Sequence, residues 1–177
     1  MSILFSNPPW WEGKESRGFL RKKRWRRGVR SGSRWPFTYL GRCTPDNSRA
    51  KDYIPYPYFL GYATSYVANN IGENNVYFRD SIALSESYKS FYNYLDTIKN
   101  KIEYFLIESA TPSWNHDYEL IKEIKKNYPN LKIIVAGPIS TSDQKWDSDI
   151  IHAVIKGEFE KNVMKVINGE NGLINHD

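Results

Sequence analysis

Two stretches rich in hydroxyl groups and glycine stand out in this chain of 177 residues, IESATPS at 107–113 and AGPISTS at 136–142. Each of them comes directly after an apolar run. Serine and threonine hydroxyls and the exposed backbone of a glycine turn are groups that hold a ligand through hydrogen bonds. The alternative interpretation is capping, in which Ser113 or Asn115 starts a helix and Gly137 ends a strand. Taken alone, the two stretches favour capping.

Residue sets that would point to catalysis or metal binding are missing from the sequence. The three histidines, His116, His152 and His176, form no Ser/His/Asp set, and no paired-carboxylate site is apparent. Residues 28–32 contain two glycines but lack the Lys-Ser/Thr that completes a phosphate-binding loop. Cys43 is the only cysteine, which excludes a disulfide framework, a Cys-rich zinc site and a self-contained iron–sulfur cluster.

The elements that would position these stretches alternate between apolar strands and helical patterns. Helices are expected over 57–70, over 85–101 with Ser85 or Ser87 as its cap, around Leu120, and over 158–167. Strict alternation of this kind is typical of an α/β fold, here a Rossmann/flavodoxin-like, five-stranded parallel sheet with helices on both faces. The five strands are expected at 3–6, 76–80, 104–108, 132–137 and 153–157.

An open parallel sheet binds its ligand outside the carboxyl ends of its strands. At those ends this sequence places residues that are small, hydroxylated or expose the backbone. Such residues suit a bulky ligand that main-chain amides can reach, although the fold alone does not identify it. The strand ends are Asn7-Pro8-Pro9, Asp80-Ser81, 108–113, Gly137-Pro138 and Lys156-Gly157-Glu158.

Residues 10–55 do not fit the alternation and are expected to form an irregular, Arg- and Trp-rich insertion after the first strand. Within it, residues 17–35 hold nine of the 25 Lys and Arg and no acid, so the remainder is mildly acidic despite the net charge of +5. This asymmetry indicates a local anionic partner. Nucleic acid, a ligand, a second domain and plain solvent all remain open as partners of this segment.

The pair IESATPS and AGPISTS resembles the cobalamin-binding domain of methionine synthase. In that family a Ser-rich turn ending in Thr-Pro-Ser follows the third strand, and a Gly-Gly turn with Thr-Ser follows the fourth. The resemblance implies that these turns line a slot for the dimethylbenzimidazole tail of cobalamin. Hydroxyls would bond polar groups of the tail, and glycine would let a flat heterocycle approach the backbone. By position it assigns Ser109, Thr111, Ser113, Gly137 and Thr141 to the slot.

A longer pattern extends this resemblance over nearly the whole chain. Its motifs are NPPWW, GVRSGSRWP, YIPYPYFLGYA, RDSIALSESY, IESATPS, AGP and VIKGEFE. Their order and spacing are similar to the N-terminal half of cobalamin-dependent radical S-adenosylmethionine enzymes, a class that includes methyltransferases and a chlorophyll-ring cyclase. Asp80 and Glu108 would either bond corrin amides or cap turns. The resemblance adds these cofactor-binding candidates: Asn7, Pro8, Arg30, Ser31, Arg34, Trp35, Asp80, Pro138, Gly157 and Glu158.

Two departures limit what the resemblance implies. The histidine that ligates cobalt in methionine synthase is replaced by NPPWWEG, so cobalamin is expected base-off, without a protein histidine ligand. The cysteine motif that holds a [4Fe–4S] cluster is missing, so this chain is not expected to cleave S-adenosylmethionine by itself. A radical S-adenosylmethionine domain would have to act in cis or in trans. The chain ends at VINGENGLINHD, near the expected inter-domain linker, as either a fragment or a free-standing module.

The leading hypothesis is therefore a single cobalamin-binding domain over 1–177 that presents cobalt to a radical-generating partner, for methyl transfer. The alternative is a small nucleic-acid-binding protein that uses the Arg/Lys-rich segment 17–35. No apolar run approaches the ~18 residues of a membrane span, and the first residues do not resemble a signal peptide. We therefore expect no membrane partner and a cytoplasmic location.

Overall fold

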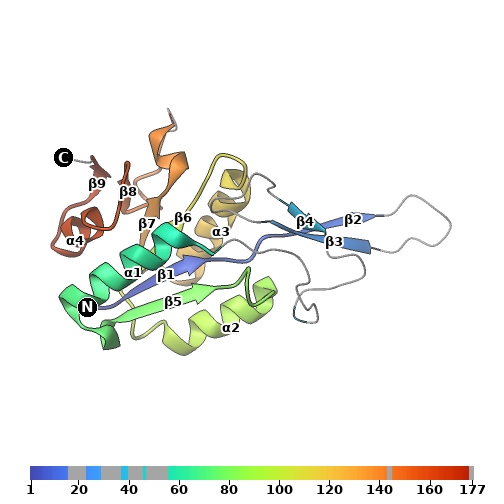
Figure 1. Cartoon of the computed structure of the whole chain (residues 1–177), viewed down its shortest axis with the longest axis horizontal. Helices are drawn as coiled ribbons and strands as arrows, with labels where there is room; N and C mark the ends of the chain where they lie inside the picture. The colour runs from blue at the N-terminus through green and yellow to red at the C-terminus, as the bar shows by residue number, and fades with distance from the viewer. Residues whose placement is uncertain (16–22, 29–36, 40–45, 47–55, 143–144, 176–177) are drawn as a thin grey trace.

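A six-stranded sheet in which every pairing is parallel forms the centre of the protein. The computed structural model describes residues 1–15, 23–28, 37–39, 46, 56–142 and 145–175. Figure 1 shows the strands of this sheet, which are β1 (Ile3–Asn7), β5 (Val76–Asp80), β6 (Tyr104–Glu108), β7 (Lys132–Ala136), β8 (Ala153–Ile155) and β9 (Gly172–Ile174).

The strand order is β5-β1-β6-β7-β8-β9. From β1 the chain passes to the edge strand β5 and then returns past β1 to β6. Connections therefore diverge between β1 and β6, which is the topological switch point where doubly wound sheets bind ligands. The first five strands follow the flavodoxin-type order, so the predicted α/β, Rossmann-like class is confirmed.

Within the main sheet, sequence analysis missed strand β9, which pairs in parallel with β8 at the edge of the sheet. It has three residues, of which only Ile174 is buried. A strand this short shows neither an apolar run nor an alternation by which it could be recognised.

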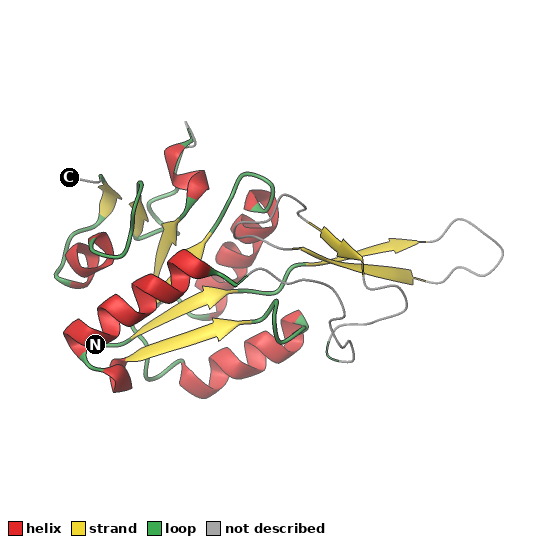
Figure 2. Cartoon of the chain, in the orientation of Figure 1, coloured by secondary structure: helices red, strands yellow, loops and turns green. Residues whose placement is uncertain are grey.

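Helices cover both faces of the sheet (Figure 2). They are α1 (Tyr58–Ile71), α2 (Tyr88–Ile98), α3 (Trp114–Asn127) and α4 (Asn162–Ile167), with short 3-10 turns η1 (Glu73–Asn75) and η2 (Pro138–Thr141). Side chains of successive strand residues point to opposite faces. Leu4 accordingly packs with α2 and α3, whereas Ile3 and Phe5 pack with α1 and α4. All three are fully buried, and each such burial stabilises the fold by ~1.5–3 kcal/mol.

The helix limits follow from local chemistry. Ser87 caps α2 by accepting a hydrogen bond from the Ser90 amide at 3.1 Å, as one of the two predicted caps. Gly72 ends α1 at φ +90°, a conformation that favours glycine. Pro129 follows the end of α3. The last helix is shorter than predicted because α4 begins at Asn162 instead of Glu158.

Three segments of the insertion form a second, antiparallel sheet, where the sequence predicted irregular structure. Its order is β2-β3-β4, and it extends beyond the carboxyl ends of β1 and β5 (Figure 1). The sequence of its central strand, KRWRRG, shows no alternation of apolar and polar residues, so periodicity does not reveal it. The strands are β2 (Trp11–Glu15), β3 (Lys23–Gly28) and β4 (Phe37–Tyr39).

Trp10 holds strand β3 of this second sheet, and Trp11 attaches the sheet to the main body. Trp10 is 1% exposed, and its indole covers Gly28 so closely that a Cβ there would lie 2.0 Å from the ring. The Gly28 amide also donates a hydrogen bond to the Trp10 carbonyl at 2.7 Å. Trp11 donates from Nε1 to the carbonyl of Glu86 at 2.6 Å, and the Glu86 carboxylate is held by Arg79 and Ser81. The second sheet is therefore fixed to the loop between β5 and α2.

Across the described ranges of the chain, none of the helices combines the length and the apolarity that crossing a bilayer requires.

Candidate functional site

A pocket of about 390 Å³ lies at the carboxyl ends of β6, β7 and β8. We call it the carboxyl-end pocket. Its volume falls within the range of small-molecule sites. It is lined by Phe59, Glu108, Ser109, Ala110, Gly137, Pro138, Thr141, Gly157, Glu158, Phe159 and Glu160. The lining residues come from the turns after three neighbouring strands and from the first turn of α1.

Six of the residues predicted from the sequence line this pocket together. They are Ser109, Gly137, Pro138, Thr141, Gly157 and Glu158. The turns after β6 and β7 are joined by main-chain hydrogen bonds, from the Ser109 amide to the Ala136 carbonyl at 2.9 Å and from the Ile139 amide to the Ser109 carbonyl at 3.2 Å. Two stretches nearly thirty residues apart thus form one continuous wall, as the parallel topology requires.

Gly137 occupies a backbone conformation that is essentially restricted to glycine, with φ +90° and ψ −173°. A Cβ at this position would lie 2.7 Å from the Ser109 carbonyl oxygen and 2.8 Å from Glu108 Cγ. Any side chain here would therefore collide with the neighbouring turn. Glycine is required so that the two turns can approach each other.

Glu108 is the most unusual group at the pocket, because one oxygen of its buried carboxyl has no hydrogen-bond partner among the described residues. The residue is 6% exposed, and its Oε2 has no hydrogen-bond partner among the described residues. The pKa of the Glu108 carboxyl is raised to about 7, first by burial and then by the negative charge of Glu160, although a hydrogen bond from the Leu60 backbone lowers it. A buried polar atom without a partner is costly, and such groups concentrate at functional sites.

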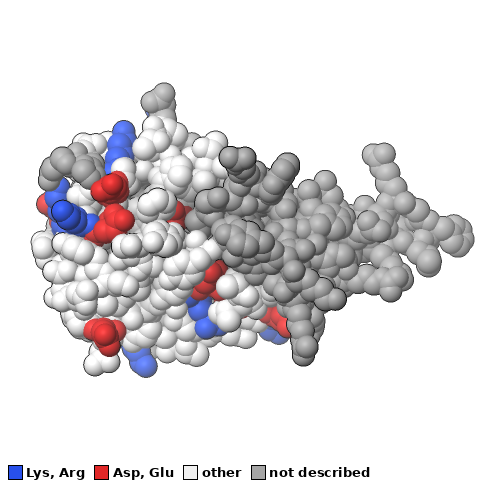
Figure 3. Space-filling view, viewed as in Figure 1, with Lys and Arg blue, Asp and Glu red and all other residues white. Residues whose placement is uncertain are grey.

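The segment between β8 and α4 supplies further acidic groups, Glu158 and Glu160. Acidic and basic side chains gather around α4 in Figure 3, whereas the surface along α1 shows none. The sequence of α1 contains no charged residue. The walls of the carboxyl-end pocket are therefore apolar and aromatic on the α1 side, through Phe59, and acidic on the α4 side. Phe59, Phe159 and Glu160 lie within the motifs YIPYPYFLGYA and VIKGEFE, but they were not among the residues predicted to bind a cofactor.

The Ser109 hydroxyl is not directed to a ligand. It donates a hydrogen bond to Asp117 Oδ2 at 2.6 Å, and Asp117 is fully buried in the first turn of α3. Ser109 therefore lines the carboxyl-end pocket, but its hydroxyl already donates its hydrogen bond to Asp117. Asp117 was not singled out, yet its position three and four residues before Leu120 and Ile121 places it on the apolar helix face.

Several other predicted residues lie away from the pocket. Asn7 donates from Nδ2 to Asp80 Oδ1 at 2.9 Å, and the same oxygen accepts from the amides of Ile82 and Ala83. Asp80 thus caps the turn after β5, which is the structural alternative of the two weighed for it. Pro8 is buried directly after β1.

Two members of the Thr-Pro-Ser motif are also outside the pocket lining. Thr111 is exposed. Ser113 is 1% exposed, and its hydroxyl bonds the amide and the carbonyl of Ala110 at 3.3 and 3.1 Å. Ser113 therefore shapes the turn that precedes α3. The motif contributes to the pocket through the turn it forms more than through its own side chains.

Four of the candidate residues, Arg30, Ser31, Arg34 and Trp35, lie outside the described residues, as does most of the basic segment 17–35. His116, in the first turn of α3, packs its ring against Trp10 with centroids 5.3 Å apart. Within the described part of the chain, no group of three or more His, Cys, Asp or Glu side chains could hold a metal ion.

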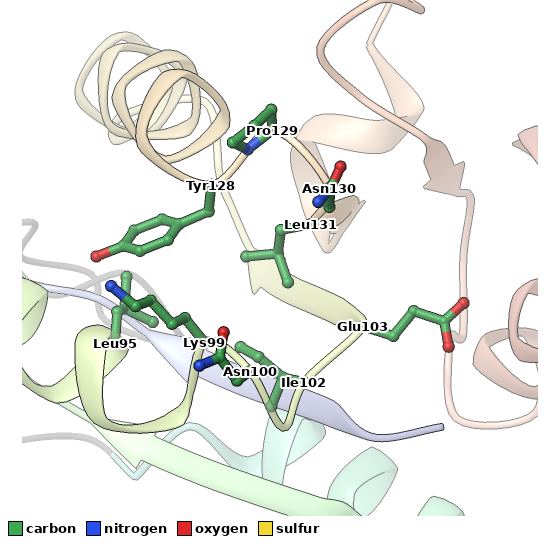
Figure 4. A pocket seen from close by; sticks show the side chains of 9 residues that line it. All are labelled: Leu95, Lys99, Asn100, Ile102, Glu103, Tyr128, Pro129, Asn130 and Leu131. Carbon is green, nitrogen blue, oxygen red and sulfur yellow. The ribbon is translucent and has the colours of Figure 1, made fainter.

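A second pocket of about 280 Å³ lies at the opposite end of the sheet, and we call it the amino-end pocket (Figure 4). Leu95, Ile102 and Leu131 contribute apolar side chains, and Tyr128 and Lys99 lie on one side of it. None of the residues that line it has a buried side-chain polar atom without a partner. Lys125 donates to the carbonyls of Pro129 and Leu131 at 2.8 and 3.1 Å.

Comparisons of the chain with protein families, with curated proteins and with solved structures return no match.

Proposed function

We propose that this chain is a cobalamin-binding module whose carboxyl-end pocket holds the dimethylbenzimidazole tail of the cofactor. One observation carries the proposal. The two stretches that resemble the cobalamin-binding family, 107–113 and 136–142, meet at the carboxyl ends of adjacent strands and line a single pocket with Gly157 and Glu158. The pocket lies next to the switch point, where this class of sheet binds ligands.

The residues at the pocket are compatible with such a ligand. A flat heterocycle suits a space walled by Phe59, Phe159 and Pro138, and the volume of about 390 Å³ is sufficient for it. The acidic groups of Glu158 and Glu160 favour a neutral ligand over an anionic one, and the unpaired Glu108 oxygen favours a ligand with a polar atom that can pair with it. The neutral dimethylbenzimidazole base, with its ring nitrogen, is a ligand of this kind.

In this proposal the chain holds and orients the cofactor and does no chemistry by itself. Gly137 and its turn would keep the slot open, and the aromatic side chains would exclude water from it. Methylcobalamin, when bound, supplies a methyl group attached to cobalt. Its transfer would depend on a radical S-adenosylmethionine domain, in cis or in trans, which is the partner we propose.

Absorbance of bound corrin after incubation with hydroxocobalamin and desalting tests the proposal. We expect stoichiometric retention with a base-off spectrum. Phe59→Ala should reduce retention, whereas Tyr62→Ala should not. The two side chains are a matched pair on α1, 58% and 56% exposed, but only Phe59 lines the carboxyl-end pocket. Desalted protein without corrin absorbance, or equal losses in the two variants, would contradict the proposal.

A further inference from the structure

We propose that Glu108 recognises the base of the cobalamin tail as a neutral carboxylic acid, donating a hydrogen bond to the ring nitrogen that is released from cobalt. The inference rests on the proposed function and adds a regulation to it. Tail binding would require a proton on Glu108 and would weaken as that proton is lost.

The first support is the burial of Glu108 at the pocket. The residue is only 6% exposed, and its Oε2 makes no hydrogen bond to any described group. Leaving such an atom unpaired costs free energy. A ligand atom that pairs with this oxygen would recover that cost on binding, so Glu108 favours a ligand with a complementary polar atom.

The second support is the set of charges around Glu108. The segment after β8 brings Glu160 and Glu158 to the pocket, both acidic. From α1 the only polar contact is the backbone amide of Leu60, and the η2 turn contributes no titratable group. No described Lys or Arg forms an ion pair with Glu108. Among the described residues, the charge that affects this carboxyl is that of Glu160, and it disfavours a negative charge on Glu108.

These surroundings explain why burial and Glu160 raise the pKa of Glu108 to about 7. Near neutral pH the carboxyl is thus present in both forms. The acid form can donate to an unprotonated ring nitrogen, whereas the carboxylate would place its lone pairs against the lone pair of that nitrogen. Affinity for the tail should consequently fall about tenfold for each pH unit above about 7.

Binding of methylcobalamin between about pH 6 and about pH 8.5 tests the inference. Methylcobalamin is chosen because its upper ligand does not titrate in this interval. Methylcobinamide, which has the corrin without the nucleotide tail, is the matched ligand. The wild-type protein should lose affinity for cobalamin as pH rises, while its affinity for cobinamide stays level.

Glu108→Gln provides the matched variant, because the amide of glutamine donates a hydrogen bond without titrating. It should bind cobalamin at the higher pH more tightly than the wild type, with a level pH profile. Glu160→Gln removes the charge that raises the pKa, so it should move the midpoint to lower pH without abolishing the profile.

The possible failures are distinguishable. Cobalamin affinity that does not change with pH, or that changes equally in Glu108→Gln or for cobinamide, overturns the role of Glu108 and leaves the cobalamin module standing. If neither corrin binds the wild-type protein at any pH, the proposed function is wrong and the inference is wrong with it.

Discussion

The two ends of the central sheet each carry a pocket, but they treat their polar groups differently. At the amino end, polar side chains pair within the protein. Lys132 contacts Glu103 at 2.8 Å, and Tyr128 donates to Asp96 at 3.3 Å. At the carboxyl end, Glu108 keeps an unpaired buried oxygen, and Gly137 holds a conformation that other residues avoid.

This difference sets the two pockets apart. Selection for stability alone would pair or remove a buried, unsatisfied carboxyl, since it destabilises the folded protein. The amino-end pocket has apolar walls, but none of its lining residues has a buried side-chain polar atom without a partner. The carboxyl-end pocket has apolar walls and also the unpaired oxygen of Glu108. Stability measurements on matched positions at the two ends can therefore test the distinction without any ligand.

The largest effect is expected from Gly137→Ala. The added Cβ would clash with Ser109 and Glu108 while φ remains positive, which should lower the free energy of unfolding by about 4 kcal/mol. Gly72→Ala is the control at the amino end. It has the same φ of +90° but its nearest neighbour is 3.7 Å away, so it should cost only about 1–2 kcal/mol. Urea unfolding of both variants measures the difference, and equal losses would mean that the two turns are not tightly apposed.

The next largest effect is expected from Glu108→Gln, whose free energy of unfolding should depend on pH less than that of the wild type. The pKa of Glu108 rises from 4.5 to about 7 on folding, so between these values the folded wild type holds a proton that the unfolded chain has lost. Wild-type stability should therefore fall as pH rises through this interval and level off above about 7. The variant should not lose stability in this way. In the wild type the loss in free energy of unfolding amounts to about 1.4 kcal/mol for each pH unit that separates the folded and unfolded pKa values.

Glu103→Gln at the amino end is the control for that titration, because Glu103 is partly exposed and paired with Lys132. It should change stability by no more than about 0.5 kcal/mol over the same pH range. Parallel pH profiles for Glu108→Gln and the wild type would show that the Glu108 carboxyl is not desolvated.

The smallest of the three effects is expected from Ser109→Ala. The buried Asp117 carboxylate would lose its 2.6 Å hydrogen bond, at a cost of ~1–3 kcal/mol. Tyr128→Phe removes a comparable bond, from the hydroxyl to exposed Asp96, and should cost less than about 0.5 kcal/mol. Thermal unfolding compares the two. If Tyr128→Phe lost as much stability as Ser109→Ala, the two ends of the sheet would not differ in how strongly their hydrogen bonds stabilise the fold.

Local patterns in the sequence were sufficient for most of the fold. The strands at 3–6, 76–80 and 104–108 are apolar enough to be recognised by themselves, and Ser87 marked the start of α2. The second sheet was not predictable in this way. Its central strand is polar and basic, its other strands show no clear alternation, and the contacts of Trp10 and Trp11 join residues far apart in the chain.

Several of the residues that line the candidate site could be predicted from the sequence, but the raised pKa of Glu108 could not. Strand topology correctly gathered Ser109, Gly137 and Gly157 at one pocket. The state of Glu108, however, depends on Glu160, which is about fifty residues away and reaches it only through the parallel pairing of β6, β7 and β8. A sequence shows where a carboxylate stands in the chain, but it does not show which charges will surround it.

Strand β1 is synthesised before the other strands of its sheet, yet both of its neighbours come much later. Its residue Asn7 lies opposite Asp80, 73 positions further along the chain, and β6 follows still later. Pairing between such distant strands is slow, because the entropy cost of closing a long loop comes before the strands form any stabilising contact. The buried segment Ile3–Asn7 would therefore wait unpaired on the ribosome while the insertion, α1 and β5 are being made. The length of the insertion thus sets how long a newly synthesised chain exposes this strand, and shortening it should speed folding.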